Sequence, residues 1–294
     1  MNSRSARTTA AALVTVAALG LTACGADAGA AVDASSTPGL PELLKKAEES
    51  GSLKVGASVN APIAYLDTST GQLAGITADV MREYLDRKGL GDKVELDVEM
   101  MDFSSLIPAL QSGRIDYIID TMYVTPQRDE VVDFTDTLFY NPEALVVPKG
   151  NPGDLAELSQ LCGKSAGSYE GSAYLTMITA ASDACGSDPI DVKTYPKVDD
   201  VMNDIAAGRL DAGVIDATLT SYAISANPGM GIELVTDYAV ADKASTAASN
   251  AVTPGNEDFL TDYDEQLAAM KSDGTFAEIL EANGLTPADY FLQP

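Results

Sequence analysis

The sequence has no histidine and only three cysteines in its 294 residues. Without histidine it can form neither a Ser-His-Asp triad nor a histidine-based general base. Most zinc sites are excluded as well, because their ligands are mainly histidine and cysteine. Any chemistry must therefore come from carboxylates, arginine, lysine, hydroxyl groups and aromatic rings, and we expect neither a metal nor a cofactor.

Basic residues are also scarce, with 18 Lys and Arg against 44 Asp and Glu, so the formal net charge is −26 and the pI lies near 4.1. Phosphate backbones and anionic lipid head groups are bound through Lys and Arg, and a surface this acidic would repel both. The composition therefore excludes a nucleic-acid-binding protein. A hydrophobic content of 46% with 21% charged residues indicates one or two folded globular domains at this length.

The first 23 residues have the pattern of a secretory signal peptide. Arg4 and Arg7 precede an apolar run over residues 10–21, which is too short to span about 30 Å of hydrocarbon as a permanent helix. The small residues before Cys24 resemble the lipobox of bacterial lipoproteins, which predicts cleavage there and lipidation of Cys24. The alternative is an ordinary cleavage site with an incidental cysteine. Removing two arginines from 18 bases leaves 16 against 44 acids, a mature charge of −28.

Residues 24–39 are small and polar without a hydrophobic period, which predicts a flexible tether with a mean reach of roughly 20 Å. If Cys24 is lipidated, Cys162 and Cys185 remain, and two cysteines outside the cytoplasm usually form a disulfide. This bond would join the start of a predicted strand to the end of the helix after it. A redox pair is the alternative, but the Cys-x-x-Cys spacing is missing.

From residue 41 onward, helix-period and strand-period segments alternate, which indicates an α/β protein with parallel sheets and helical crossovers. The patterns predict helices over residues 41–50, 78–88 and 104–111, and strands over residues 53–59 and 94–100.

Two segments share one order of residues. Residues 109–120 (ALQSGRIDYIID) and 204–216 (DIAAGRLDAGVID) both run from a helix end through Gly-Arg and an aliphatic-Asp pair into a buried strand that ends in Asp. The repeat predicts two lobes of similar architecture, although such a short pattern also arises by chance. Ligands of parallel sheets lie beyond the carboxyl ends of the strands, which places Asp120 and Asp216 where the lobes face each other.

Several segments together resemble the family 3 solute-binding proteins of ABC transporters. They occur in the expected order between about residues 53 and 280: GSLKVGAS, APIAYLD, GQLAGITADVMREYL, MDFSSLIPALQSGRIDYII, VTPQRDEVVDFTDTLFY, AAGRLDAGVIDATLTSYA and MKSDGTFAEIL. The resemblance implies a two-lobed periplasmic-binding-protein type II fold, each lobe a mostly parallel sheet flanked by helices. Two hinge strands are expected near residues 138–146 and 246–252. The implied first lobe covers residues 40–142 and 250–294, and the second lobe covers residues 143–249.

The resemblance also implies binding roles. Arg128 ends a Thr-x-x-Arg motif that starts at Thr125, and the arginine of this motif binds the ligand carboxylate in the family. A guanidinium group offers a planar fork of donors that an ammonium group cannot reproduce. Asp216 matches the acid that holds the ligand ammonium. The alternatives are a salt bridge from Arg128 to Asp129 or Glu130, and a helix N-cap at Asp216.

Further positions follow from the same resemblance. Thr121 and Tyr123 match a stretch that holds ligand, although Tyr123 replaces a commoner Ser or Thr. Phe103 matches an aromatic residue that packs on the ligand in several members, and a core aromatic is its alternative. Ser172 is expected to meet the ligand carboxylate at a helix N-terminus, and Tyr169 to line the pocket.

Two positions depart from the family pattern. Asn60 is expected in the pocket, but Asn60 and Ile63 flank Pro62, where many amino-acid binders have an aromatic residue. The side-chain preference is therefore open. Asp120 stands where a small residue or Ser is common. It either faces the cleft and favours a ligand with an extra cationic group, or turns away and is structural.

The leading hypothesis is an extracytoplasmic, monomeric protein that captures a small zwitterionic solute, with a polar amino acid as first candidate. It would be anchored to the cell membrane by Cys24 and would deliver the solute to a permease and an ATPase on separate chains, because the sequence shows no Walker motif or membrane helix.

Three other hypotheses stay open. A compatible solute of the ectoine type is the runner-up ligand, because NAPIAYLD with Phe103 and Tyr123 resembles the ectoine-binding subgroup, although Ile63 stands where that subgroup tends to have an aromatic residue. An enzyme resembling cyclohexadienyl dehydratase would need a placed acid such as Asp120 or Glu170. A purely sensory protein is the third.

Overall fold

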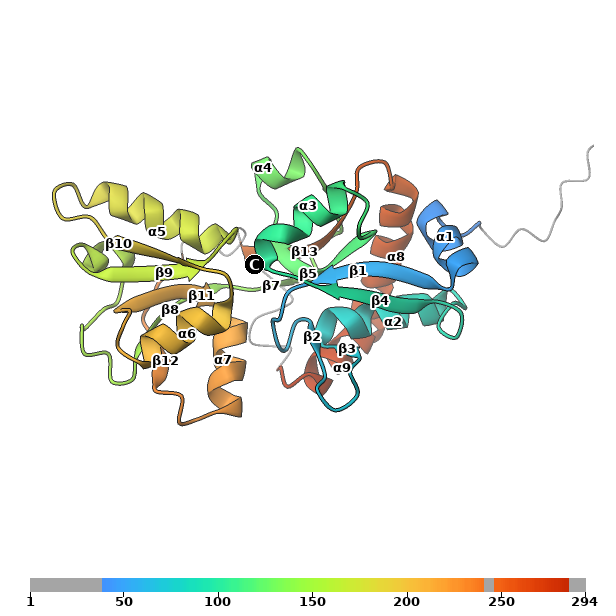
Figure 1. Ribbon diagram of the computed structural model, residues 1–294. Coiled ribbons are helices and arrows are strands. Elements are labelled where there is room, and N and C mark those ends of the chain that lie inside the picture. Colours follow the sequence, from blue (N-terminus) through green and yellow to red (C-terminus); the bar gives the residue numbers. More distant parts are fainter. Residues whose placement is uncertain (1–38, 241–245, 286–294) are drawn as a thin grey trace, which may run out of the picture. The chain divides into compact units, whose positions relative to one another are not determined.

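The computed structural model describes residues 39–240 and 246–285 (Figure 1). The predicted signal peptide, Cys24 and nearly all of the predicted tether lie outside the described residues. The compact unit of the chain begins at Leu40. None of the described helices combines the length and the hydropathy that crossing a bilayer requires.

The first sheet is built around three parallel strands, with β1 (Ser52–Ala57) between β4 (Glu95–Met100) and β5 (Tyr117–Tyr123). β5 also pairs antiparallel with β13 (Ala247–Val252), which in turn pairs with β6 (Asp133–Phe134) and β7 (Phe139–Tyr140). The helices of this lobe are α1 (Glu42–Ser50), α2 (Ile76–Arg87), α3 (Leu106–Gln111), α4 (Pro126–Asp129), α8 (Glu257–Asp273) and α9 (Thr275–Ala282). Shorter elements are β2 (Tyr65–Leu66), β3 (Leu73–Ala74) and the 3₁₀ turn η1 (Phe103–Ser105).

The second sheet is built in the same way. β9 (Ser165–Tyr169) lies between the parallel strands β10 (Asp191–Tyr195) and β11 (Ala212–Asp216), and β11 pairs antiparallel with β8 (Glu143–Pro148). β12 (Ile232–Leu234) completes the sheet beside β8. The other elements of this lobe are η2 (Leu158–Leu161), α5 (Ala173–Ala184), α6 (Val198–Ala206) and α7 (Ala217–Ala226).

The predicted repeat corresponds to a real repetition of topology. The strand orders β4-β1-β5-β13 and β10-β9-β11-β8 are equivalent, with three parallel strands followed by one antiparallel strand. In the first lobe α3 leads through a left-handed glycine into β5, and in the second lobe α6 leads through another into β11. These glycines, Gly113 and Gly208, have φ angles of 69° and 66°, a backbone conformation that other residues adopt only with strain. The expected two-lobed α/β fold is confirmed.

The predicted elements agree with the structure to within a few residues. The helix expected over residues 41–50 is α1, which stops at the left-handed Gly51, and the one expected over residues 78–88 is α2. The strands expected over residues 53–59 and 94–100 are β1 and β4. The helix expected over residues 104–111 begins one residue earlier, as η1, and continues as α3.

The chain passes between the sheets at the expected first hinge, because β7 pairs in the first sheet and β8 in the second, with only Asn141 and Pro142 between them. The second hinge needs a correction. The expected lobe boundary at residue 250 falls inside β13, and Ala247 already pairs with Tyr140 of the first sheet. β13 therefore belongs to the first sheet from its first residue, Ala247.

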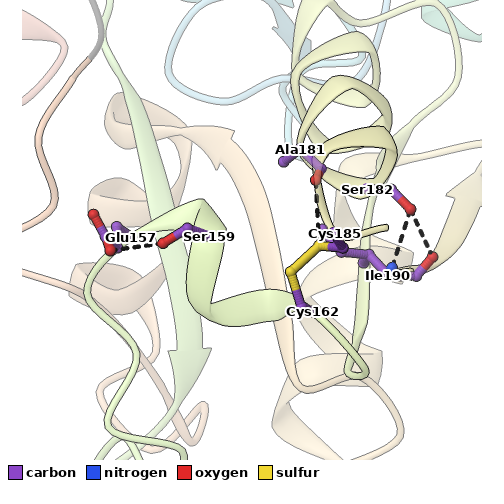
Figure 2. The surroundings of a disulfide bond; sticks show 7 residues. All are labelled: Glu157, Ser159, Cys162, Ala181, Ser182, Cys185 and Ile190. Carbon is purple, nitrogen blue, oxygen red and sulfur yellow. Dashed lines mark hydrogen bonds between the residues drawn. A yellow bond between two sulfur atoms is a disulfide. The ribbon is translucent and has the colours of Figure 1, made fainter. Parts of the chain in front are cut away.

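A disulfide joins Cys162 to Cys185, with the two Cα atoms 5.5 Å apart (Figure 2). Cys162 follows η2 and precedes β9, and Cys185 caps the end of α5, as the sequence predicted. Ser182, one turn earlier in α5, accepts a hydrogen bond from the Ile190 amide at 3.0 Å, which fixes the connection to β10. The disulfide and this hydrogen bond together attach the end of α5 to the second sheet.

Replacing both cysteines by serine is expected to lower the free energy of unfolding by roughly 3 kcal/mol, because the bond closes a loop of 23 residues in the unfolded chain. Urea unfolding of the wild type and of the double variant measures the difference. Dithiothreitol should destabilise the wild type alone. Equal stability of the oxidised wild type and the variant would contradict this account.

Candidate ligand-binding site

A cavity lies where strands of both sheets end, and residues of both lobes line it. We call it the Asp216 cavity, and its walls are Phe103, Thr121, Met122, Tyr123, Arg128, Asn141, Tyr169, Ser172, Ala173, Tyr174, Asp216 and Ala248. Seven of the nine ligand-binding residues expected from the sequence are in this list. The free volume is about 20 Å³, which holds about one water molecule, so a solute can enter only after the walls separate.

Arg128 reaches this cavity because of a tight turn after β5. Thr125 caps α4 by accepting the Arg128 amide at 3.3 Å, which turns the Arg128 side chain back toward the end of β5. Its guanidinium donates to the carbonyl of Tyr123 at 2.7 Å and, across to the second lobe, to the carbonyl of Gly171 at 2.9 Å. The guanidinium carbon also lies 5.5 Å from the centre of the Phe103 ring.

Arg128 forms no ion pair with any described carboxylate, so the salt bridges considered for it with Asp129 and Glu130 are not found. Burial lowers its pKa, because the charged form loses hydration. Among the described residues, the guanidinium contacts two carbonyl oxygens and one aromatic ring. Its positive charge is therefore stabilised by these neutral groups and not by a carboxylate.

Asp216 carries the opposite charge on the second lobe. It ends β11, is 7% exposed, and its Oδ1 accepts hydrogen bonds from Asn141 Nδ2 and Tyr174 Oη, both at 2.8 Å. Its Oδ2 accepts from Tyr169 Oη at 3.0 Å. Burial raises the pKa of this carboxyl, and the tyrosine hydrogen bonds oppose that rise. The side chain makes no capping hydrogen bond to α7, so the N-cap alternative is not what the structure shows.

Sequence reasoning missed two of the three Asp216 partners. Asn141 lies at the first crossing, where its Oδ1 accepts a hydrogen bond from Thr218 Oγ1 at 2.7 Å, which fixes its amide toward Asp216. The Asn-Pro pair is a turn signal that could have drawn attention to it. Tyr174 is the second residue of α5, and no sequence pattern indicates that its hydroxyl points to Asp216.

Aromatic rings meet across the two lobes. Phe103 packs edge to face on Tyr169, with centroids 5.4 Å apart, and Tyr123 packs in the same way on Tyr174 at 5.5 Å. The hydroxyl of Tyr123 donates to the carbonyl of Asn141. Phe103 is only 8% exposed, as expected for a core aromatic residue, and it also lines the Asp216 cavity.

Ser172 caps α5. Its hydroxyl accepts the Leu175 amide at 3.2 Å and donates to the Tyr169 carbonyl at 2.7 Å. These bonds hold the start of α5 at the cavity wall, beside Ala173. The Ser172 hydroxyl thus stabilises the local structure, and it holds the N-terminus of α5 at the cavity wall.

A second hollow of about 220 Å³, the Asn60 pocket, lies beside the Asp216 cavity. It is lined by Ser58, Val59, Asn60, Met100, Met101, Asp102, Phe103, Tyr169, Pro196, Lys197, Val198 and Asp199. Phe103 and Tyr169 line both hollows, so the two adjoin at these rings. Asn60 lines only the second hollow, and Arg128 and Asp216 line only the Asp216 cavity. Ile63 lines neither hollow and is buried in the core at 1% exposure.

Asp120 matches the structural alternative considered for it. It is 1% exposed, lines neither hollow, and accepts hydrogen bonds from the Ser58 amide at 2.9 Å, the Thr121 amide at 2.8 Å and Asn60 Nδ2 at 3.1 Å. The Ser58 hydroxyl donates to it as well. Burial raises its pKa to about 6. Glu170, the other acid considered for catalysis, is exposed and lines neither hollow.

Residues 53–285 match the family model of the bacterial extracellular solute-binding proteins, family 3. The chain belongs to this family. Among family 3 relatives, the lysine/arginine/ornithine-binding periplasmic protein of Escherichia coli K12 is 28% identical over 84% of this chain and 90% of its own. The L-cystine-binding protein TcyJ of the same strain is 26% identical over 81% and 85%. A solved ancestral arginine-binding protein bound to arginine is 33% identical, covers 79% of this chain and 97% of its own, and has a TM-score of 0.69.

Asp120 makes the stability of this family 3 protein depend on pH. Its folded-state pKa lies near 6, above the ordinary value of 3.8, so between these pH values the folded protein keeps a proton that the unfolded chain has lost. Its contribution to the free energy of unfolding therefore falls as the pH rises from about 4 to about 6, by roughly 2 kcal/mol.

The Asp120→Asn variant lacks this contribution, so its stability relative to the wild type should improve by roughly 2 kcal/mol between pH 4 and pH 7. Urea unfolding at both pH values measures the change. Glu170→Gln, at an exposed acid, is the control and should show no such change. A constant difference between Asp120→Asn and the wild type would overturn the assignment.

Proposed function

We propose that the protein binds a small zwitterionic solute, with a polar amino acid as first candidate, between Arg128 and Asp216. The observation that carries this proposal is the placement of two opposite charges, one from each lobe, on the walls of one cavity. Neither charge has an ionic partner among the described residues. Relatives named for binding lysine, arginine, ornithine and cystine support an amino acid as ligand.

The contacts of the closed cavity indicate how a ligand would act. The Gly171 carbonyl of the second lobe occupies one donor of the Arg128 guanidinium. A ligand carboxylate would replace this neutral acceptor with a charged one, and charge-assisted hydrogen bonds are the stronger kind. Its cationic end would meet Asp216 on the other lobe. Because such a ligand touches both lobes, it would shift the population from open toward closed molecules.

Removing the Arg128 guanidinium should abolish most binding. Isothermal titration of Arg128→Ala with the best ligand is expected to show about a 100-fold loss of affinity, because two charge-assisted hydrogen bonds disappear. Arg128→Lys should fall between this variant and the wild type, since a lysine keeps the charge but not the planar fork.

The matched control is Arg114→Ala, since Arg114 pairs with Glu99 on the exposed side of the first sheet and lines neither hollow. Its affinity should equal that of the wild type. Unchanged affinity of Arg128→Ala would disprove the site assignment.

A compatible solute of the ectoine type is the second candidate ligand. The aromatic walls favour it, since four rings line the Asp216 cavity: Phe103, Tyr123, Tyr169 and Tyr174. The buried Ile63 supplies no ring to either hollow. Thermal-shift assays with amino acids, ectoine and glycine betaine separate the candidates, because only a true ligand of the folded state raises the melting temperature.

We assign no catalytic role to the chain. Its relatives carry the names of binding proteins, and the two acids considered for dehydratase chemistry lie outside both hollows. Asp120 is committed to four donors, and Glu170 is exposed. Turnover of prephenate or arogenate by the purified protein would show that this assignment is wrong.

Delivery to an ABC permease and an ATPase on separate chains is part of this proposal and is supported by family membership. A membrane anchor at a lipidated Cys24 is also part of it and is supported by the small residues that precede this cysteine. We expect a Cys24→Ala variant to leave the membrane fraction, because a lipid chain attached at residue 24 would be the anchor. Fractionation of cells that express the wild type and the variant measures this. Retention of the variant with the membrane would argue against lipidation at Cys24.

A further inference from the structure

Asn60 presents an unused hydrogen-bond acceptor beside the Asp216 cavity, and we infer that this atom, Asn60 Oδ1, selects a ligand whose side chain ends in an N–H donor. Carboxamide, ureido and guanidinium groups are such ends, and a carboxylate or methyl end is disfavoured. The inference rests on the proposed function, because the same ligand would extend from the Asp216 cavity into the Asn60 pocket. It adds Asn60 as a residue that determines specificity and Asp120 as the residue that positions it.

The side-chain amide of Asn60 is held in one orientation by the buried Asp120 carboxylate. Asn60 Nδ2 donates to Asp120 Oδ2 at 3.1 Å and also to the Ser58 hydroxyl oxygen. The Ser58 hydroxyl in turn donates its only proton to Asp120. Turning the amide over would therefore bring Oδ1 against a carboxylate and a hydroxyl oxygen that both act as acceptors, which is unfavourable. Nδ2 faces Asp120, and Oδ1 lies at the other edge of the amide.

The backbone polar atoms of Asn60 are used within its own loop. Its amide donates to the Ala64 carbonyl at 2.9 Å, and its carbonyl accepts the amides of Ile63 at 2.7 Å and Ala64 at 3.0 Å. No described residue donates to Oδ1. Within the described ranges, the buried side-chain atoms that lack a partner are Tyr117 Oη and Ser249 Oγ, so Asn60 Oδ1 is not sealed in the core. It is the polar atom that Asn60 has left for the pocket it lines.

The Asn60 pocket continues the cavity in which the zwitterionic end of a ligand would bind. The rings of Phe103 and Tyr169 line both hollows, and their centroids are 5.4 Å apart. One ring belongs to each lobe, so separation of the lobes also parts the rings. Phe103 lies 5.5 Å from the guanidinium carbon of Arg128. A ligand whose carboxylate is bound by Arg128 can therefore extend its side chain past Phe103 into the Asn60 pocket.

The size and the charge of the pocket suit this kind of side chain. Its volume is about 220 Å³, whereas the Asp216 cavity has about 20 Å³. The charged residues on its walls are Asp102, Lys197 and Asp199, and none of them forms an ion pair with a described residue. Two acids against one base disfavour a carboxylate end. The same charges tolerate a neutral N–H donor and attract a cationic one.

A methyl end is disfavoured for another reason. When a side chain fills the pocket, it removes Asn60 Oδ1 from water, and a buried acceptor without a donor is costly. An N–H group replaces the lost water, and a methyl group of the same shape does not. A site built around such an acceptor therefore rejects the analogue that lacks the donor.

Titration calorimetry on the mature protein tests the inference with ligands that differ only in the end group. L-glutamine is paired with 5-oxo-L-norleucine, and L-citrulline with Nδ-acetyl-L-ornithine, because in each pair a methyl group replaces the terminal amide nitrogen. L-glutamate supplies the carboxylate end. The titrations are made at pH 8, where Asp120, with a pKa of about 6, is ionised.

The nitrogen-ended member should bind at least about fivefold more tightly than its methyl-ended partner, and L-glutamine more tightly than L-glutamate by the same factor. A smaller difference would overturn the inference and leave the proposed function intact. Binding only of zwitterions without a nitrogen-ended side chain would do the same. Failure of every zwitterion to bind, including the twenty common amino acids and ectoine, would overturn both. One set of titrations therefore distinguishes the two failures.

Asn60→Leu then tests whether Asn60 is the source of the preference. Leucine has a similar shape but no acceptor, so the nitrogen-to-methyl affinity ratio should fall at least threefold. Met101→Leu is the matched control, because Met101 lines the same pocket without a hydrogen-bonding amide. It should keep the wild-type ratio. An unchanged ratio in folded Asn60→Leu would show that another residue makes the selection, and thermal unfolding shows whether each variant is folded.

Asp120→Asn tests the positioning role. An amide at residue 120 both donates and accepts hydrogen bonds, so the Asn60 amide loses the negative charge that fixes its orientation. The affinity ratio should lie between those of the wild type and Asn60→Leu. A stability effect alone does not change this ratio, because both ligands are measured on the same folded protein. A ratio equal to that of the wild type would contradict the role assigned to Asp120.

Discussion

The burial of one charge, the Asp216 carboxylate, is the constraint on which the arrangement of the cleft depends. An ionised carboxylate at 7% exposure is stable in a protein only when donors replace the water it has lost. Asn141 comes from the crossing between the lobes, Tyr169 from a strand end and Tyr174 from a helix start. Satisfying one carboxylate thus fixes three segments of the chain around the cavity.

Arg128 is the counterpart of this carboxylate on the first lobe, and the two charges give the cavity a polarity. The chain is strongly acidic, with 44 acids against 18 basic residues, so a carboxylate ligand needs a local positive site to approach. Arg128 supplies one from a four-residue helix, and carbonyl groups, not acids, hold it in place. A zwitterion aligned with this polarity would compensate both buried charges.

Local patterns predicted the fold well, and contacts between distant segments limited the prediction of the site. Glycines in the left-handed conformation ended helices where the sequence placed them, at Gly51 and Gly113, because this effect is local. The sequence could not decide whether the Asp120 side chain faces the cleft, because its partner Ser58 lies 62 residues away and strand alternation alone could not orient the side chain. Tyr174 was missed for the same reason, since its bond to Asp216 spans 42 residues.

The central claim is that Arg128 binds the carboxylate of the ligand. The most direct test compares the affinities of the wild type and Arg128→Ala for the best zwitterionic ligand and for its decarboxylated amine. The account predicts that removing the ligand carboxylate costs the wild type about 100-fold in affinity but costs Arg128→Ala little, because each change removes the same interaction. Equal losses in both proteins would show that the carboxylate binds elsewhere and would contradict the account.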